Sequence, residues 1–266
     1  MNQNPIQNST SGTKSRVNVL GVGISVLNLT IATQRILDAV KSRTKGFVCI
    51  TGVHGVIESQ SDVALRKIHN RAYLVTPDGM PMVWAGKLAG HSEMGRVYGP
   101  DLMLEICRVS AEHNVKHFFY GGANNVAVDL KEHLEKRYPG LNVVGTYEPP
   151  FRPLNDAEVR QLEEQVSQAR PDIFWVGLST PKQEKFMAEY LPKLGATIMI
   201  GVGAAFDFHS GRVRQAPRWI QRSGFEWLYR LCSEPRRLWK RYLRNNPLFL
   251  WAYFLQKTGL KKFELD

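Results

Sequence analysis

The feature that most constrains the fold of this chain is a regular alternation of short apolar runs with longer amphipathic segments. The runs are rich in β-branched and aromatic residues and stay apolar at successive positions, which is typical of strands buried on both faces of a parallel sheet. Strand–helix alternation at this spacing predicts an α/β fold, a layered domain with a mostly parallel sheet. The expected strands are Val17–Val22, Phe47–Thr51, Tyr73–Val75, His117–Tyr120, Val143–Gly145, Ile173–Gly177 and Thr197–Gly201.

The segments between these runs have the periodicity of helices. Asn155 is followed three residues later by Glu158, a pair that can cap the start of a helix reciprocally. Pro139-Gly140 is a signal that ends a helix. The helices expected in this part of the chain are Ile31–Val40, Ala127–Tyr138 and Asn155–Ala169.

The two ends of the chain depart from this pattern. The first sixteen residues are polar, contain no apolar segment of a secretory signal, and are expected to form a flexible tail. After Gly211 the alternation stops. Three short helices are expected there, at Trp219–Leu231, Pro235–Leu243 and Pro247–Leu255. We therefore divide the chain into the tail (1–16), a layered domain (17–211) and a helical appendage (212–266).

Charge is distributed unevenly between the layered domain and the appendage. The chain has 35 Lys and Arg against 24 Asp and Glu, and the segment from Gly211 to the end holds 13 of the basic and 4 of the acidic residues. That segment therefore carries +9 of the net +11, together with four of the six tryptophans. Basic and aromatic residues together are typical of surfaces for nucleic acid or anionic membrane. The near-neutral layered domain argues against nucleic acid.

Composition also bears on metals and on the membrane. The three cysteines, Cys49, Cys107 and Cys232, are far apart and lie in apolar or amphipathic runs, so we interpret them as buried small hydrophobic residues in a reducing compartment. The sequence has no D-x-D pair and no His, Cys and Asp at metal-ligand spacing, so neither a metal nor another cofactor is expected. The apolar segment Leu248–Leu255 is too short to cross a bilayer, which needs about 20 residues.

Polar motifs follow several of the expected strands, where open α/β sheets bind ligands. Asp78 in Thr76-Pro-Asp-Gly-Met80 can be a helix N-cap, or a carboxylate at the rim of a cleft that accepts a proton. In Gly177-Leu-Ser-Thr-Pro-Lys-Gln-Glu184, Pro181 opens a helix whose free N–H groups and Lys182 suit an anion, while Gln183 can bond a sugar hydroxyl or a base edge. An ordinary helix start with a solvated face explains this second motif equally well.

Three further motifs are more ambiguous. Gly21-Val-Gly23 resembles the start of a dinucleotide fingerprint but lacks its third glycine. Gly201-Val-Gly203 is ambiguous in the same way. Phe206 and Phe208 flank Asp207, which suits the stacking of a ring beside a hydrogen-bonding acid, and His209 is interpreted as a packing residue. Arg96 in Arg96-Val-Tyr-Gly-Pro-Asp101 is either a surface charge or part of a site.

Taken together, these motifs resemble the WecG/TagA/CpsF glycosyltransferase family. The resemblance rests on Thr51, the Asp78 and Arg96 motifs, the loop ending at Glu184, and Gly201-Val-Gly-Ala-Ala-Phe-Asp-Phe-His-Ser-Gly211, all in order from about Val17 to Leu243. It implies a Rossmann-like catalytic domain with a basic, membrane-binding helical appendage. It also implies an inverting, metal-independent transfer of a sugar from a UDP-sugar to an undecaprenyl-diphosphate-linked sugar, on the cytoplasmic face of the cell membrane.

The resemblance also assigns roles to residues. Asp78 matches the general base, Thr51 a polar residue of the same site, and Gln183 and Asp207 the donor pocket. Arg230 and Arg237, with Lys240 or Arg241, match arginines that close over the diphosphate. Lys182, Gly203, Phe206 and Arg96 complete the expected substrate-binding set. The chain departs from the Thr-x-Asn of many members, since it has Thr51-Gly-Val-His54 instead.

The transferred sugar, the polysaccharide and the oligomeric state stay open at this stage. N-acetylmannosamine, its uronic acid and glucose all occur within the resemblance, and the product is an exopolysaccharide, a teichoic acid or another cell-envelope polymer. A homo-oligomer is neither implied nor excluded. Two other hypotheses compete with the transferase. One is a nucleic-acid-binding protein that uses the basic appendage, and the other is an NAD-dependent oxidoreductase.

Overall fold

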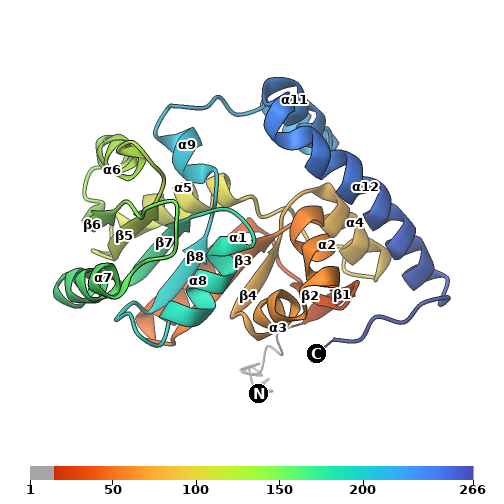
Figure 1. The fold of residues 1–266 in the computed structure, drawn as a ribbon, viewed down its shortest axis with the longest axis horizontal. Helices are drawn as coiled ribbons and strands as arrows, with labels where there is room; N and C mark the ends of the chain where they lie inside the picture. The colour runs from red at the N-terminus through yellow and green to blue at the C-terminus, as the bar shows by residue number, and fades with distance from the viewer. Residues whose placement is uncertain (1–14, 266) are drawn as a thin grey trace, which may run out of the picture.

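The computed structural model of the chain describes residues 15–265, apart from the side chains of Arg222 and Arg237 (Figure 1). Its centre is a six-stranded sheet in the order β4-β3-β8-β7-β5-β6, in which all paired neighbours are parallel. The predicted layered α/β fold, Rossmann-like with a parallel sheet, is confirmed. The strands are β3 (Gly46–Thr51), β4 (Leu74–Pro77), β5 (Lys116–Gly121), β6 (Asn142–Tyr147), β7 (Ile173–Gly177) and β8 (Ile198–Gly201).

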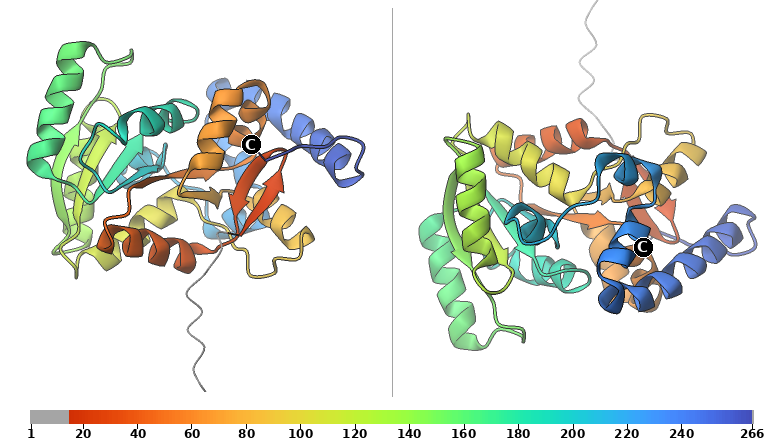
Figure 2. Two further views of the ribbon diagram at one scale, coloured as in Figure 1. Left: turned by 90° about the horizontal axis from the view of Figure 1, so that it is seen from below. Right: turned by 90° about the horizontal axis from the view of Figure 1, so that it is seen from above.

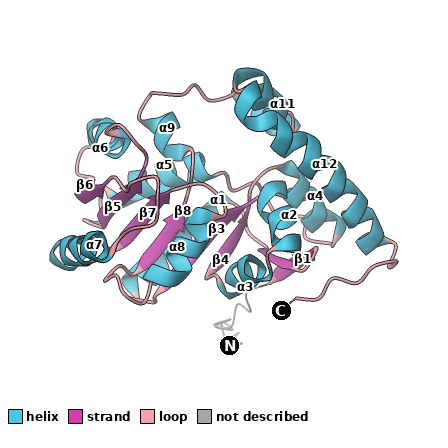
Figure 3. Ribbon diagram, viewed as in Figure 1, coloured by secondary structure: helices cyan, strands magenta, loops and turns pink. Residues whose placement is uncertain are grey.

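Helices cover both faces of this sheet, as the magenta strands between cyan helices show in Figure 3. Successive strand side chains enter opposite cores: Phe47 and Cys49 pack on one side, Val48 and Ile50 on the other. Burial on both faces explains why the strands are apolar at every position. The first core lies under α2 (Val53–Ser61), α3 (Val63–Arg71), α7 (Asp156–Ala169) and α8 (Lys182–Tyr190), and the second under α1 (Leu29–Lys41), α5 (Gly99–Ser110), α6 (Val126–Arg137) and α9 (Ala205–His209).

The predicted capping of one helix is confirmed in detail. The Asn155 side chain accepts a hydrogen bond from the Glu158 backbone N–H at 2.9 Å, and the Glu158 carboxylate accepts one from the Asn155 N–H at 2.8 Å. This reciprocal pair satisfies two N–H groups that the first turn of α7 leaves free.

The first predicted strand is wrong in its extent and its partner. Val17–Val22 is not one strand of the parallel sheet but parts of a separate antiparallel hairpin, β1 (Arg16–Val19) and β2 (Val22–Ser25). The physical reason is the turn: Leu20 at φ 53° and Gly21 at φ 80° both take the left-handed conformation that a two-residue hairpin requires. The glycines of Gly21-Val-Gly23 therefore serve a hairpin and not a phosphate loop.

The appendage also differs from the three short helices expected. It forms α10 (Arg218–Ser223), α11 (Glu226–Ser233) and α12 (Pro235–Lys257), so the break expected before Pro247 is wrong. Proline removes only one helical N–H. Tertiary contacts on both sides of it hold α12 together, since Asn245 hydrogen-bonds His54 and Phe249, only 4% exposed, packs into the first core.

The end of the chain returns to the β1–β2 hairpin, where Figure 2 shows the blue C-terminal segment beside the red strands. The Gln256 side chain accepts from the Leu20 N–H at 3.1 Å and donates to the Asn18 carbonyl at 3.1 Å. Asn18 in turn donates to the Phe263 carbonyl. Helix α12 is thus fixed to the layered domain in its middle and at its end. Within residues 15–265, no helix is both long and apolar enough to span a bilayer.

Candidate active site

A cavity of about 520 Å³ lies where β3, β4, β7 and β8 end. One wall comes from the loops after these strands and from the start of α4 (Met80–Leu88), and the other from α11 and α12. Figure 1 shows α11 and the first half of α12 over this part of the sheet. The appendage therefore completes a site that the layered domain leaves open at the carboxyl ends of its strands, where such folds bind ligands.

Asp78 lies at the floor of this cavity, in the loop between β4 and α4. Its backbone N–H donates to the Thr51 carbonyl at 3.0 Å, and the N-cap of α4 is Gly79 rather than Asp78. Gly52 packs so closely that a Cβ there would lie 2.7 Å from the Asp78 carbonyl oxygen. The backbone of two adjacent strand ends thus holds Asp78 in place, and its carboxylate is not used to cap the helix.

The surroundings of Asp78 shift its proton affinity. Burial raises the pKa of Asp78 from 3.8 to about 6, and Glu226 adds to the shift, while Arg96, Arg230 and Arg241 oppose it. A carboxyl group with this pKa is ionised at neutral pH yet binds a proton far more readily than an exposed aspartate. Asp78 can therefore act as a general base.

Three arginines line the same cavity. Arg96 forms an ion pair with Glu226 and donates to the Gln221 carbonyl at 3.2 Å, and its guanidinium lies 4.2 Å from the centroid of the Tyr98 ring. Arg230 and Arg241 come from α11 and α12, and the Nε of each is buried without a hydrogen-bond partner among the described residues. Unsatisfied guanidinium donors in a cavity suit an anionic ligand such as a diphosphate.

The other cavity-lining residues predicted from sequence are Gln183 and Gly203. Gln183 is only 3% exposed, and Gly203 takes a φ of +51° beside it. Thr51, at the end of β3, is 1% exposed and directly precedes Gly52 of the lining, and its Oγ1 has no partner in the described part of the chain. The structure thus brings Asp78, Arg96, Gln183, Gly203, Arg230 and Arg241 into one cavity, with Thr51 adjacent.

Other predicted residues lie outside the cavity lining. Phe206 is 1% exposed and packs edge-to-face against Phe119, 5.9 Å between centroids, so it belongs to the core. Asp207 lies on α9 without reaching the lining, and Lys182 is exposed at the start of α8. Lys240 is exposed on α12 with its amine over the Trp239 ring, and the side chain of Arg237 lies outside the described residues.

Sequence reasoning missed several lining residues. The Glu226 side chain is 14% exposed and pairs with Arg96. Burial, followed by the charge of Glu226, raises the pKa of Tyr98. Trp84 and Trp227 form an apolar part of the wall. Glu226 had one available signal, since it is one of only four acidic residues in a strongly basic segment. The aromatic residues had no such signal, because Trp84 lies in an apolar helix and Trp227 in an amphipathic one, and both kinds of helix contain aromatic residues in any case.

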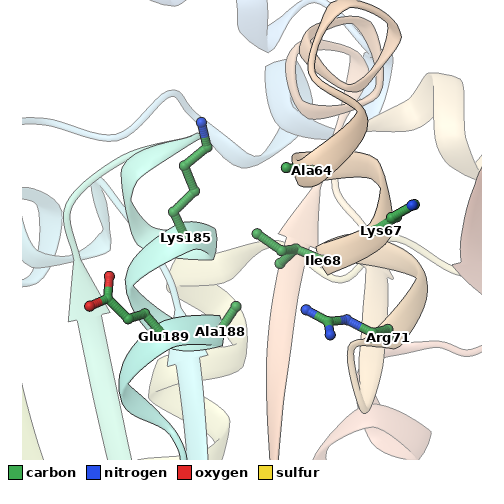
Figure 4. A pocket seen from close by; sticks show the side chains of 7 residues that line it. All are labelled: Ala64, Lys67, Ile68, Arg71, Lys185, Ala188 and Glu189. Carbon is green, nitrogen blue, oxygen red and sulfur yellow. The ribbon is translucent and has the colours of Figure 1, made fainter.

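A second hollow lies on the surface between α3 and α8 (Figure 4). Ile68 and Ala188 form its apolar part, and Lys67, Arg71 and Lys185 surround it. Lys185 forms an ion pair with Asp62 at 2.6 Å. Of the predicted site residues whose side chains are described, none lines this hollow.

In residues 15–265 no three His, Cys, Asp or Glu side chains are grouped so that they could hold a metal ion. The charged groups that the cavity offers a ligand are the carboxylates of Asp78 and Glu226 and the three guanidinium groups. This set can transfer a proton and bind an anion at the same place.

Known proteins resemble this chain over most of its length. The chain is 30% identical over 213 residues to the N-acetylglucosaminyldiphosphoundecaprenol N-acetyl-beta-D-mannosaminyltransferase of Bacillus subtilis (strain 168). The aligned region covers 76% of this chain and 79% of that protein. The chain is 28% identical over 205 residues to the protein of the same name in Bacillus spizizenii, covering 77% of each. Residues 17–263 match the glycosyl transferase WecG/TagA/CpsF family. The chain therefore belongs to this family and is a glycosyltransferase.

Proposed function

We propose that this protein transfers a sugar from a UDP-sugar to an undecaprenyl-diphosphate-linked sugar, with inversion at the anomeric carbon and without a metal ion. The observation that carries the proposal is one buried carboxylate with a pKa near neutrality, Asp78, in a cavity lined by three arginines. Both Bacillus relatives are named for adding N-acetylmannosamine to N-acetylglucosaminyl-diphosphoundecaprenol. We take this donor and acceptor as the first pair to test.

The residues of the cavity account for each step of an inverting transfer. The Asp78 carboxylate takes the proton of the attacking acceptor hydroxyl, whose oxygen then bonds to the anomeric carbon as the bond from that carbon to the UDP oxygen breaks. The electron pair of the broken bond goes to the diphosphate. Arg230 and Arg241 line the same cavity and can stabilise that charge, because their Nε–H groups have no partner among the described residues and can bond it.

The appendage supports action at a membrane surface. It exposes Trp219, Trp239 and Trp251, of which Trp219 is 72% exposed, next to lysine and arginine side chains. Tryptophan partitions to the interface of a bilayer, and each basic residue near an anionic leaflet contributes about 1 kcal/mol of attraction. We therefore place the enzyme as a peripheral protein on the inner face of the cell membrane, where it serves cell-envelope polysaccharide synthesis.

The test is an assay with purified full-length protein, UDP-N-acetylmannosamine and a short-chain polyprenyl-diphosphate N-acetylglucosamine, with and without EDTA. We expect product in both conditions, and NMR of the product should show an inverted anomeric configuration. Loss of activity with EDTA would refute the metal-independent mechanism, and retention of configuration would refute the single displacement. A rise in melting temperature with NAD but not with UDP would favour an oxidoreductase instead.

A further inference from the structure

Glu184 is a buried carboxylate that the proposed chemistry does not use. It lies in the first turn of α8, is 0% exposed, and has no basic side chain bonded to it among the described residues. Its Oε1 accepts from the Thr180 hydroxyl at 2.8 Å and from the Gln183 side-chain Nε2 at 3.1 Å, whereas its Oε2 has no partner in the described part of the chain. Burial raises the pKa of Glu184, and the hydrogen bonds to its carboxylate oppose the shift.

The hydrogen bond from Gln183 to Glu184 fixes the orientation of the Gln183 amide. A carboxylate only accepts hydrogen bonds, so the NH₂ group of the amide must face it. The amide also packs flat on Gly201, where an added Cβ would lie 3.0 Å from both its Cδ and its Nε2. Rotation of the amide by a half-turn would bring two acceptor oxygens together.

The opposite end of the amide lies on the cavity side. Gln183 Oε1 is buried and has no hydrogen-bond partner among the described residues. It is directed to Gly203, from whose would-be Cβ it lies 3.5 Å, and both residues line the cavity. A buried carbonyl without a partner costs free energy, and a ligand that donates a hydrogen bond would recover it.

We propose that Glu184 is a positioning residue that holds Gln183 with its carbonyl oxygen toward the cavity, so that the ligand must present a hydrogen-bond donor there. This inference rests on the proposed function, in which the ligand is a UDP-sugar. Three groups of such a ligand are donors: the imide N–H of uracil, the ribose hydroxyls, and a hydroxyl or acetamido N–H of the transferred sugar. Cytosine has an acceptor in place of the imide N–H.

The experiment measures binding of UDP, CDP and UDP-N-acetylmannosamine by calorimetry to the wild-type protein, Glu184→Gln and the control Glu189→Gln. Glu189 is an exposed residue of the same helix that pairs with Lys193 at 3.1 Å. Glu184→Gln keeps the shape but lets the Gln183 amide turn, so we expect affinity for the UDP-sugar to fall about tenfold. The control should bind like the wild type.

The three ligands separate the three sources of the donor group. If the donor is uracil, the wild type prefers UDP to CDP, and this preference disappears in Glu184→Gln. If the donor is a ribose hydroxyl, Glu184→Gln weakens all three ligands alike. If the donor is on the transferred sugar, Glu184→Gln weakens only UDP-N-acetylmannosamine. If Glu184→Gln bound all three ligands as tightly as the wild type does, this inference would be overturned and the proposed function would stand. Failure of the wild type to bind any uridine ligand would overturn the proposed function and this inference with it.

A double-mutant cycle separates positioning from a general structural role. Because Glu184 acts through Gln183, adding Glu184→Gln to Gln183→Leu should weaken binding no further, and additive losses would overturn the inference. Should Glu184→Gln not fold, Gln183→Leu carries the test. A loss of UDP-sugar affinity with an unchanged melting temperature supports an acceptor at this position, and wild-type affinity overturns it.

Discussion

The layered domain and the appendage solve different physical problems. The sheet is buried on both faces by apolar side chains, and residues outside the appendage are nearly neutral. The appendage is short in buried apolar residues, strongly basic, and exposes large aromatic side chains. The proposed base, Asp78, comes from the first region, and the cations Arg230 and Arg241 come from the second. The difference teaches that the site exists only where the two regions meet.

The largest effect on turnover should come from replacing Asp78, which belongs to the layered domain. Asp78→Asn removes the proton acceptor but keeps the shape, so we expect turnover to fall by about 10²–10⁴-fold while UDP binding survives. Rates are measured with the assay described above, and UDP binding by calorimetry. Turnover within about threefold of the wild type would show that another group is the base.

Replacing an arginine of the appendage should give the next largest effect on turnover. Arg230→Ala and Arg241→Ala each remove a donor to the departing diphosphate, and we expect about 10²–10³-fold losses in turnover. Lysine at either position should restore little, because it lacks the planar fork of donors. Arg244→Ala, an exposed residue of α12 outside the cavity lining, is the matched control. Equal losses in the control would mean that only overall charge matters.

The apolar surface of the appendage can be tested apart from its arginines. Trp219→Ala combined with Trp251→Ala removes two rings that are 72% and 62% exposed. Each buried aromatic contributes roughly 1.5–3 kcal/mol to partitioning, so pelleting with anionic liposomes should fall more than tenfold. Activity on a short, soluble acceptor should not change. Unchanged pelleting would assign membrane attachment to charge alone.

The acidity of the site gives a prediction that involves both regions. The pKa of Asp78 is raised from 3.8 to about 6, so kcat/KM should fall about fivefold between pH 6 and pH 5 as the base is protonated. Because the pKa of Asp78 is higher in the folded than in the unfolded chain, Asp78 contributes most to the stability of the folded state below pH 3.8. That stability is lost as the pH rises from about 3.8 to about 6, and it stays low above this range. Asp78→Asn should therefore raise the melting temperature at pH 7.5 and have little effect at pH 4.

Sequence reasoning was most successful where one physical factor dominates. The six sheet strands were found because burial on both faces leaves a continuous apolar run. Asp78, which directly follows one such strand, and Gln183, in the first turn of the helix after another, were expected at the site for that reason. By contrast, Phe206 looked like a stacking residue, yet it fills the space beside Gly177, where a Cβ would lie 2.8 Å from its ring. Whether an aromatic residue faces a core or a cavity depends on tertiary packing, which spacing along the chain does not encode.

The appendage was harder to predict for the same reason. Pro247 ends a helix by local propensity, but long-range contacts of Asn245 and Phe249 outweigh it. The ion pair of Arg96 with Glu226 joins residues 130 positions apart, and no local sequence pattern predicts it. Local signals thus predicted the layered domain well, while the appendage is determined mainly by what it packs against.

The smallest expected effect concerns how the two regions are held together. The Asn245 side chain donates to His54 Nδ1 at 2.9 Å, and His54 also bonds the backbone of Thr180. Arg241 lies one turn before Asn245 on α12, so this contact fixes the arginine relative to Asp78. Asn245→Ala should cost about 1 kcal/mol of stability and lower kcat several-fold, with a normal KM for the acceptor. If Asn245→Ala lost stability but no activity, the contact would serve folding alone, and the arginines would be positioned by α11 and the anchoring of Gln256.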